Sequence, residues 1–371
     1  MDPFPTPRPN YYKVLIKCNT FNHSKFIEDT LNGFVMQQTT FPYVCLIIND
    51  ASTDGEQKLI KSFLQKECDM SKVQRYDTEP AEVLIVPHRT NQQCTLAIYL
   101  LRENHYSIKR SKIPYIQPWR DCCTYEAKCE GDDYWIDPHK LQKQVDYLES
   151  HPDYTMVCNR TKLYSEKKKK YIGENYCYNK DATIKTKDVI YRSGLFISTC
   201  SIIYRLSLLK NYPDYCRKCA VGDYPLQIMA AMKGYIYYFN DIMSVYRVQN
   251  SESWMSQQKW SSVEEKNLAR LDSMLNMFKG FSQDFPEYSH YFRNKITQYL
   301  ITGAPLNLPN KEKDIETYYN YYKKDIHKFP LWGKILYKLK YTNIPILRGY
   351  YVTYTEPIFK RFRYKNLIYK K

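Results

Sequence analysis

The first ninety residues alternate between apolar runs and segments with helical periodicity. Residues 12–18 and 43–49 have the pattern of strands, and the second run is apolar at nearly every position, as in a strand buried on both faces. A third run covers residues 83–86. Apolar residues three or four apart predict helices at residues 26–35 and 59–64, between these strands. The order strand, helix, strand, helix, strand predicts a parallel, doubly wound α/β sheet.

The pattern is less regular between residues 91 and 123, and we interpret this stretch as an insertion. Further along the chain, short apolar runs predict strands at residues 154–158, 196–204, 235–239 and 242–247. These runs add a second group of strands to the three near the amino terminus.

Two helices in this second part carry clear start signals. The first follows Asp137, which can cap it, and Pro138, which suits the first helical position. The second is predicted to begin at residues 222–225 and to end at Gly234.

Three polar turns fall at the ends of predicted strands: Thr20–Asn22, Asp50–Asp54 and Glu130–Asp133. In doubly wound sheets, ligands bind outside the carboxyl ends of the strands, so we expect these turns to converge on one site. The last turn holds three carboxylates within four residues, which repel one another unless a cation or hydrogen-bond donors hold them. A divalent metal that also binds phosphates is the usual reason for such a cluster. The alternative is a solvated acidic turn followed by a helix cap.

Composition limits the classes of partner and compartment. The 371 residues are 43% hydrophobic and carry a net charge of +16, which favours anionic partners such as nucleotides, lipid head groups or nucleic acid. No run of about 18 apolar residues occurs, so no spanning helix is expected. Residues 1–10 are a Pro-rich, flexible lead-in without the apolar run of a signal peptide. The twelve scattered cysteines are typical of reduced thiols in a cytoplasmic protein.

The positive charge is concentrated at the carboxyl-terminal end. Residues 321–371 hold ten Lys and three Arg against one Asp and one Glu, which accounts for +11 of the total. Helical periodicity covers residues 263–278, 288–301 and 332–339. Basic and aromatic residues are interleaved over residues 330–371, as in segments that lie on an anionic membrane surface, here near a lipid-linked acceptor. The alternative is a basic helix packed on its own domain.

The motifs at the three turns resemble those of the family-2 glycosyltransferases of the GT-A fold. Thr20-Phe21-Asn22 is similar to that family's Thr-Tyr-Asn turn, and residues 49–54 are similar to its Asp-Asp-Gly-Ser-Thr-Asp segment. Residues 130–133 resemble its Asp-x-Asp-Asp metal motif, and the longer run 130–144 is similar to a bacterial surface-polysaccharide subgroup. The resemblance covers roughly residues 12–250.

The resemblance implies an α/β fold of the GT-A type, a Rossmann-like nucleotide-diphospho-sugar transferase domain with a mixed sheet flanked by helices, at residues 11–250. Residues 251–371 are then a helical, basic and aromatic C-terminal extension. The implied activity is inverting, hexosyltransferase-like transfer from a nucleotide sugar, a UDP-sugar, to a hydroxyl of a glycan or lipid-linked acceptor. The implied setting is polysaccharide biosynthesis for the cell envelope, in the cytoplasm or at the inner face of the cytoplasmic membrane, with no nucleic-acid partner.

The resemblance also implies roles for individual residues. Asp50 would contact the base or ribose, Phe21 would flank the base, and Glu130 would face the ribose. Asp132 would hold a Mg²⁺ or Mn²⁺ that bridges the diphosphate, and Asp223 would be the general base. The other candidates are Thr20 and Asn22 for the nucleotide, Asp133, Arg247 and Gln249 near the donor sugar or metal, and Trp135, Gly222 and Tyr224 near the acceptor.

The sequence departs from the family pattern at two places. Asn91 lacks the Gly that the family has after it. Gln249 stands where relatives often carry His, so the diphosphate or metal contact made by that His is not expected here in the same form. Structural roles are the alternatives for four candidates: a turn cap for Asp50, a core position for Phe21, an ion pair for Arg247 and a helix cap for Asp223.

Two other functions compete with glycosyl transfer. A nucleotidyltransferase would need a basic, Gly-rich phosphate loop near the first strand, and none is present. A nucleic-acid or anion-binding protein without catalysis would fit the charge, but no RNA or DNA motif occurs. Glycosyl transfer needs a metal as Lewis acid on the leaving diphosphate and a base within reach of the acceptor hydroxyl, and candidates for both are present.

Overall fold

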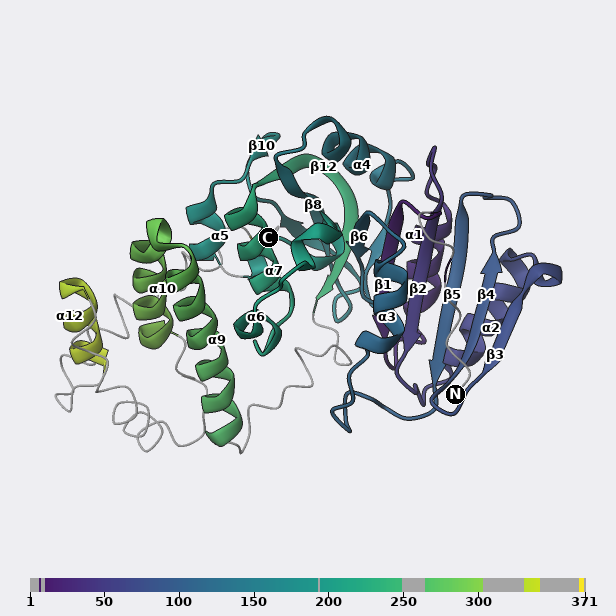
Figure 1. The fold of residues 1–371 in the computed structure, drawn as a ribbon, viewed down its shortest axis with the longest axis horizontal. Coiled ribbons are helices and arrows are strands. Elements are labelled where there is room, and N and C mark those ends of the chain that lie inside the picture. The colour runs from purple at the N-terminus through teal and green to yellow at the C-terminus, as the bar shows by residue number, and fades with distance from the viewer. Residues whose placement is uncertain are drawn as a thin grey trace.

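A mixed β-sheet runs through the middle of the protein, and helices cover both of its faces (Figure 1). The structure is a computed structural model that describes residues 7, 11–192, 194–248, 264–302, 330–340 and 367–369. Within these residues, thirteen strands belong to one sheet, whose main path runs β10-β12-β8-β11-β6-β1-β2-β5-β4-β3. This is the mixed α/β architecture expected from the sequence.

Four neighbouring strands at the centre of the sheet are parallel. They are β6 (Tyr125–Lys128), β1 (Val14–Thr20), β2 (Tyr43–Asn49) and β5 (Cys94–Leu101). All seven residues of β2 are buried, which explains its nearly continuous apolar sequence. Because the four strands run the same way, the turns that follow them open at one edge of the sheet.

The stretch at residues 91–123 is not an irregular insertion. It contains β5 and the helix α3 (Ile113–Arg120), and β5 is the third parallel strand beside β2. The run predicted at residues 83–86 is β4 (Ala81–Pro87), which is antiparallel to both β5 and β3 (Gln74–Asp77). The parallel strand beside β2 is therefore β5, and the run predicted for that place is the next strand in the sheet and antiparallel.

The second half of the sheet also differs from the predicted strands in two places. Residues 196–204 are mostly short 3-10 turns, and only β11 (Ile203–Arg205) is extended. The two strands predicted at 235–239 and 242–247 form one bulged strand, β12 (Tyr235–Val248). The remaining strands are β7 (Tyr134–Trp135), β8 (Tyr154–Ser165), β9 (Lys170–Asn175), β10 (Ala182–Thr183) and β13 (Leu367–Tyr369).

Helices pack on the two faces of the amino-terminal half through separate cores. On one face lie α1 (Ile27–Val35), α2 (Glu56–Glu67) and α4 (Lys140–Ser150), and on the other lies α3. The predicted face of α2 includes Leu59, but this side chain is 43% exposed, and Ile60, Phe63 and Leu64 make the core contact.

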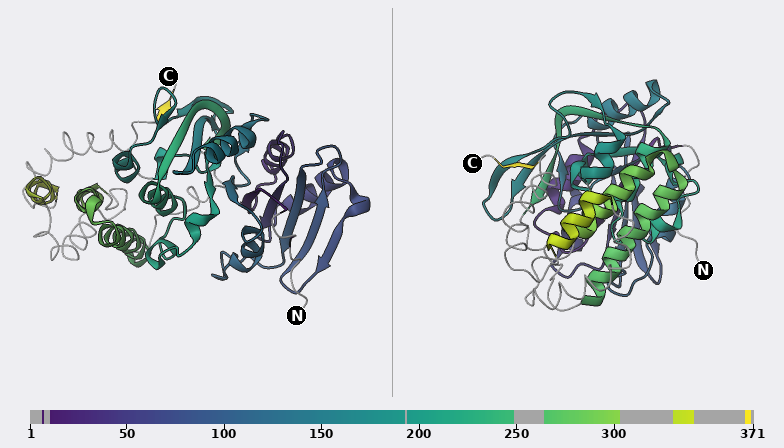
Figure 2. Two further views of the ribbon diagram at one scale, coloured as in Figure 1. Left: turned by 45° about the horizontal axis from the view of Figure 1, so that its top comes forward. Right: turned by 90° about the vertical axis from the view of Figure 1, so that its left-hand side faces the viewer.

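The helices of the second half of the chain stand beside the other half of the sheet (Figure 2). They are α5 (Thr186–Arg192), α6 (Asp214–Arg217), α7 (Asp223–Lys233), α9 (Glu264–Asp284), α10 (Ser289–Thr302) and α12 (Leu331–Lys340). Apolar residues of α5, α7, α9 and α10 share one core. The helices predicted at 222–234, 263–278, 288–301 and 332–339 are thus present, while the division into domains at residue 250 stays a prediction.

The cysteines agree with the expectation of reduced thiols. All twelve cysteines are free thiols, and ten of them are buried. Among the helices that the structure describes, none has the length and apolar character needed to cross a bilayer.

Candidate active site

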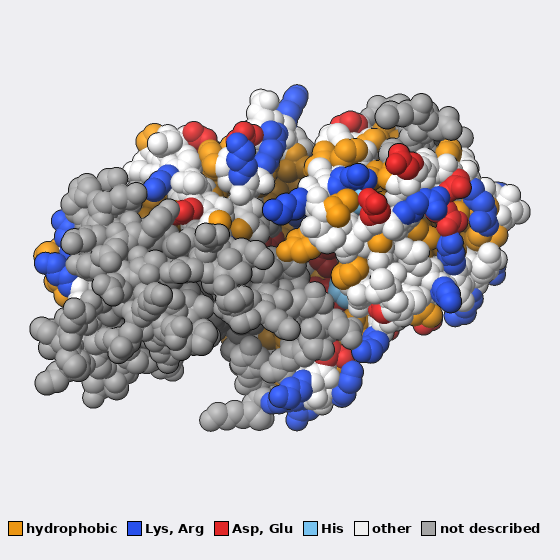
Figure 3. Space-filling model, turned by 90° about the horizontal axis from the view of Figure 1, so that it is seen from below, with side chains coloured by type: hydrophobic (Ala, Val, Ile, Leu, Met, Phe, Trp, Pro, Cys, Tyr) orange, Lys and Arg blue, Asp and Glu red, His pale blue; other side chains and the backbone are white. Residues whose placement is uncertain are grey.

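The three polar turns meet at the carboxyl edge of the parallel strands. The Asp50 amide donates to the carbonyl oxygen of Thr20 at 2.9 Å, and the Gly131 amide donates to that of Asn19 at 3.1 Å. Backbone hydrogen bonds therefore join the turns after β1, β2 and β6. Figure 3 looks onto this edge, where acidic and histidine side chains lie at the floor of a hollow.

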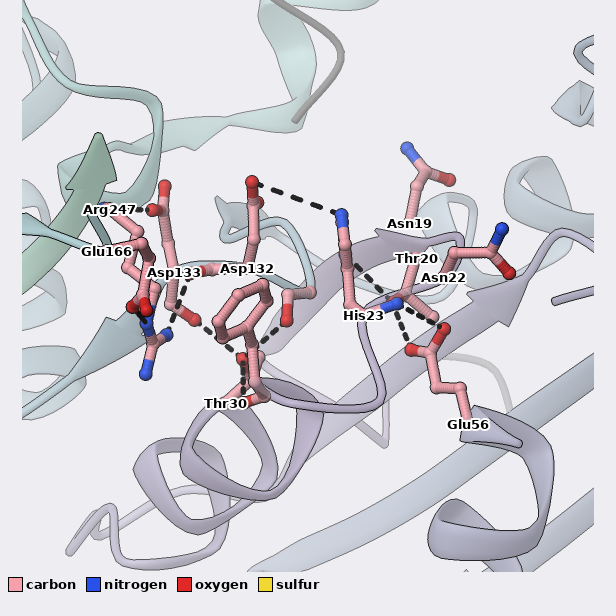
Figure 4. A network of polar contacts seen from close by, with 12 residues as sticks. Asn19, Thr20, Asn22, His23, Thr30, Glu56, Asp132, Asp133, Glu166 and Arg247 are labelled. Carbon is pink, nitrogen blue, oxygen red and sulfur yellow. Dashed lines mark hydrogen bonds and ion pairs between the residues drawn. The ribbon is translucent and has the colours of Figure 1, made fainter. Parts of the chain in front are cut away.

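The acidic turn at residues 130–133 is packed tightly on the end of β1. A Cβ atom on Gly131 would lie 2.1 Å from Oγ1 of Thr20, so only glycine fits there. From α1, the Thr30 hydroxyl lies 2.7 Å from the Asp133 carbonyl oxygen and 3.0 Å from that of Gly131. These contacts fix the backbone of the turn and hence the direction of its carboxylates (Figure 4).

Asp132 is the carboxylate of this turn that faces the turn after β1. Its side chain is 17% exposed, and its Oδ2 lies 4.0 Å from Nε2 of His23 (Figure 4). In the part of the chain that the structure describes, no group of three His, Cys, Asp or Glu side chains could hold a metal ion. A carboxylate donor with few protein partners fits Mg²⁺ or Mn²⁺ bound mainly through substrate phosphates, not a closed structural site.

Asp133 turns the other way, into the protein. It is 2% exposed, and its Oδ1 accepts a hydrogen bond of 2.9 Å from the Arg247 amide on β12. Burial, and then the neighbouring charge of Asp132, raise the pKa of Asp133 well above its usual range. The side chain therefore joins the acidic turn to β12.

Arg247 has a structural position beside the turn. Its guanidinium donates to Glu166 at 2.9 Å, to the Asp132 carbonyl oxygen at 2.8 Å and to Asp29. It also stacks over the Tyr134 ring, 4.4 Å from the centroid. All three guanidinium nitrogens donate to these groups, and the residue is 6% exposed. Arg247 therefore holds the acidic turn in place from within the protein. This is the structural alternative weighed for it from the sequence.

Asp50 is buried and fully engaged. Its carboxylate accepts from the amides of His105 at 2.8 Å and Tyr106 at 3.2 Å, and pairs with Lys112 at 2.8 Å. The loop after β5 is thereby held against the nucleotide side of the predicted site. The contact of Asp50 with a base or ribose stays a prediction.

The turn after β1 is cross-linked to the turn after β2. Asn22, whose φ is 56°, accepts from the Thr53 amide at 2.8 Å, and its own amide donates to Ser52 Oγ at 2.9 Å. Thr20 is buried, whereas Phe21 is partly exposed. Phe21 thus has the exposure that a base-flanking ring needs.

Two residues at this edge were not predicted from the sequence. Glu56, at the start of α2, is fully buried and accepts from the Thr20 hydroxyl and from the His23 amide at 3.0 Å. His23 itself faces Asp132. No spacing rule links these residues, because they meet only when the turn after β1 folds onto α2.

Asp223 is the first residue of α7 and is partly exposed. Its Oδ2 lies 3.4 Å from the Thr199 hydroxyl, and its Oδ1 accepts from the Tyr224 amide. Burial first, then the charges of Asp133 and Asp132 and, more weakly, that of Asp223, raise the pKa of Tyr246 well above its usual range. Tyr246 is therefore within electrostatic reach of both the acidic turn and the start of α7.

The other acceptor-side candidates divide between surface and core. Gly222 is exposed. Trp135 is 1% exposed and donates through Nε1 to the Cys200 carbonyl oxygen at 2.7 Å, and Tyr224 is 2% exposed and donates to the Ile190 carbonyl oxygen. Both aromatic side chains thus belong to the core. Glu130 is partly exposed, and Gln249 lies outside the described residues.

Comparison with solved structures identifies the fold class. The chain aligns with the crystal structure of TarS from S. aureus at a TM-score of 0.55 and 14% identity, over 95% of this chain and 55% of TarS. TarS is a glycosyltransferase of the GT-A type, and the GT-A glycosyltransferase fold expected from the motifs is thereby confirmed. The chain spans little more than half of the TarS length.

Other likenesses are weaker or uncharacterised. A mannosyltransferase from Pyrobaculum calidifontis, solved with GDP-Man and Mn²⁺, aligns at a TM-score of 0.47 and 13% identity, over 98% of this chain and 89% of that one. Two uncharacterised proteins, Mb1547 of Mycobacterium bovis and Rv1520 of Mycobacterium tuberculosis, are 27% identical over 267 residues, which is 70% of this chain and 67% of theirs. No family model matches the chain.

Proposed function

We propose that the protein is a metal-assisted, inverting glycosyltransferase that moves a sugar, a hexosyl group, from a UDP-sugar to a hydroxyl of a glycan or lipid-linked acceptor in surface-polysaccharide synthesis. One observation carries the proposal. Three polar turns of the parallel strands are joined at one edge, and Asp132 is directed into the space between them.

The donor would occupy this edge. The loop fixed by Asp50 and the ring of Phe21 would border the base, while the backbone of the turn after β1 would face the phosphates. Asp132 would hold a Mg²⁺ or Mn²⁺ on the diphosphate. The chemistry that such an ion supplies when bound is Lewis-acid stabilisation of the leaving nucleoside diphosphate.

The acceptor would approach from the α7 side. Asp223 is the partly exposed carboxylate at the start of this helix, and we assign it the role of general base. It would take the proton of the attacking hydroxyl as the new glycosidic bond forms and the bond to the diphosphate breaks. Attack on the face opposite the diphosphate inverts the anomeric centre.

The test is a screen of nucleotide sugars with Mn²⁺ and glycan or lipid-linked acceptors, in which release of nucleoside diphosphate is measured. We expect turnover with a UDP-sugar, and a loss of roughly 10²–10⁴-fold in rate for Asp223→Asn. Because Asn caps a helix about as well as Asp, this variant should keep its melting temperature and its donor binding. Asn also removes no bulk from the site.

Three outcomes would contradict the proposal. Turnover of Asp223→Asn within about fivefold of the wild type, far short of the loss of roughly 10²–10⁴-fold expected for a base, would make Asp223 a helix cap only. Release of pyrophosphate in place of nucleoside diphosphate would indicate the nucleotidyltransferase alternative. Salt-dependent binding of nucleic acid with no nucleotide-sugar turnover would favour the anion-binding alternative.

A further inference from the structure

His23 has an unusual position for a histidine that the sequence did not single out. It is 9% exposed, and its two ring nitrogens face different partners (Figure 4). Nδ1 lies 3.2 Å from the Thr20 hydroxyl oxygen, and Nε2 lies 4.0 Å from Oδ2 of Asp132. Which nitrogen carries the proton decides what this arrangement can bind.

The surroundings of Thr20 determine the tautomer. The Thr20 hydroxyl donates its single hydrogen to Oε1 of Glu56. The other oxygen of Glu56 accepts from the His23 amide at 3.0 Å and from Ser52 Oγ at 2.7 Å, which holds this carboxylate in place. Since the hydroxyl hydrogen is used, the Thr20 oxygen can only accept from His23. A neutral His23 therefore carries its proton on Nδ1 and a lone pair on Nε2.

That lone pair points at another electron-rich atom. In this neutral form no hydrogen lies between Nε2 of His23 and Oδ2 of Asp132, which face each other across 4.0 Å. The separation is close to the sum of two metal–ligand bonds of about 2.1 Å each. A divalent cation between the two atoms would turn this unfavourable arrangement into two coordinate bonds.

We propose that His23 and Asp132 together bind the divalent cation of the donor site, with Thr20 and Glu56 behind His23 to orient its ring. Histidines that bind metals usually donate their other ring proton to such an outer partner. The inference rests on the proposed function, because diphosphate oxygens would complete the coordination. An imidazole ligand favours a transition ion over Mg²⁺, so the site should prefer Mn²⁺.

The ion itself is the probe for the test. The full-length protein is loaded with Mn²⁺ and UDP, and pulsed electron paramagnetic resonance records the coupling of Mn²⁺ to a directly bound nitrogen. The same spectrum on protein labelled with ¹⁵N-histidine assigns that nitrogen to an imidazole without any substitution. We expect a histidine coupling in the wild type, its loss in His23→Gln, and Mn²⁺ affinity at least about tenfold weaker in that variant.

Controls separate this inference from the proposed function. His139→Gln changes an exposed histidine near the same turn and should keep the coupling. Melting curves of both variants report whether they fold. Mn²⁺ that binds with UDP and is lost in Asp132→Asn, but shows no histidine coupling, would overturn the inference and leave the proposed function standing; His23 would then be an imidazolium paired with Asp132. Absence of Mn²⁺ binding in every protein would overturn both.

Discussion

The position of Lys128 in the sheet changes the pKa of its side chain. On β6 it lies in register beside Lys17 of β1, and Glu126 on the same strand is paired with Arg120. Burial, and next the charge of Lys17, lower the pKa of Lys128 to about 8. The folded protein therefore holds the ammonium form of this side chain less well than the unfolded chain does.

This pKa shift predicts that Lys128→Met stabilises the folded protein, by an amount that depends on pH. The unfolded lysine titrates near 10.4, so between about pH 8 and pH 10.4 the unfolded chain binds more protons and wild-type stability rises with pH. Below pH 8 the full cost of charging this partly buried side chain is present. The variant should be more stable than the wild type at pH 7, on the order of 1 kcal/mol, and the difference should shrink by pH 10.

Urea denaturation of both proteins at pH 7 and pH 10 measures this difference. A variant that is less stable than the wild type at pH 7, or a difference that does not change with pH, would show that Lys128 is well accommodated in the fold.

At the residue scale, the sequence identified the acidic positions but not their partners. Asp50 and Asp132 follow strands that can be recognised from apolar runs, so their place at the sheet edge could be predicted. Glu56 and His23 are 33 residues apart, and Arg247 meets Glu166 from 81 residues away. Such contacts depend on tertiary packing, which local spacing does not encode.

At the element scale, the sequence pattern missed the strand β5. Residues 96–101 of β5 are apolar, but the irregular stretches on both sides hide the run. The direction of β4 could not be predicted from the sequence either, since a short apolar run fits a parallel or an antiparallel strand equally well. Two of the three register shifts between β12 and β8 fall at residues 239–244, where the polar pair Asn240-Asp241 has the composition of a turn.

The helix α12 is the element with the most unusual surface. Leu331, Trp332 and Ile335 are 75%, 39% and 51% exposed, while Tyr337 is buried. Exposed apolar residues beside lysines are typical of helices that lie in a membrane interface. The structure thus offers a surface for the membrane contact proposed for residues 330–371, which stays a prediction.

We expect the full-length protein to co-sediment with vesicles that contain anionic phosphatidylglycerol, and to bind neutral vesicles much less. The double change Trp332→Ala with Ile335→Ala should reduce this binding severalfold, because it removes apolar area without changing charge. Leu59→Ala is the matched control, since Leu59 is an exposed apolar residue on α2. Equal sedimentation of all three proteins would reject α12 as the contact.

At the scale of the whole molecule, the carboxyl-terminal helices are not a loose appendage. Met274 and Phe278 of α9 and Phe292 of α10 share a core with Ile228 and Met229 of α7, the helix that begins with Asp223. The candidate base is therefore positioned by packing from beyond the GT-A-like region. The prediction of separate segments from sequence composition could not include this shared core.

The central claim is that the acidic turn binds a nucleoside diphosphate through a divalent cation. Isothermal titration calorimetry of UDP into the full-length protein tests it most directly, with Mn²⁺ or with EDTA, and with Asp132→Asn as the matched variant. The account predicts binding with Mn²⁺, and at least about tenfold weaker binding with EDTA or in Asp132→Asn, since one or two carboxylates hold such an ion. UDP binding that is equally tight in all three conditions, or absent in all of them, would contradict it.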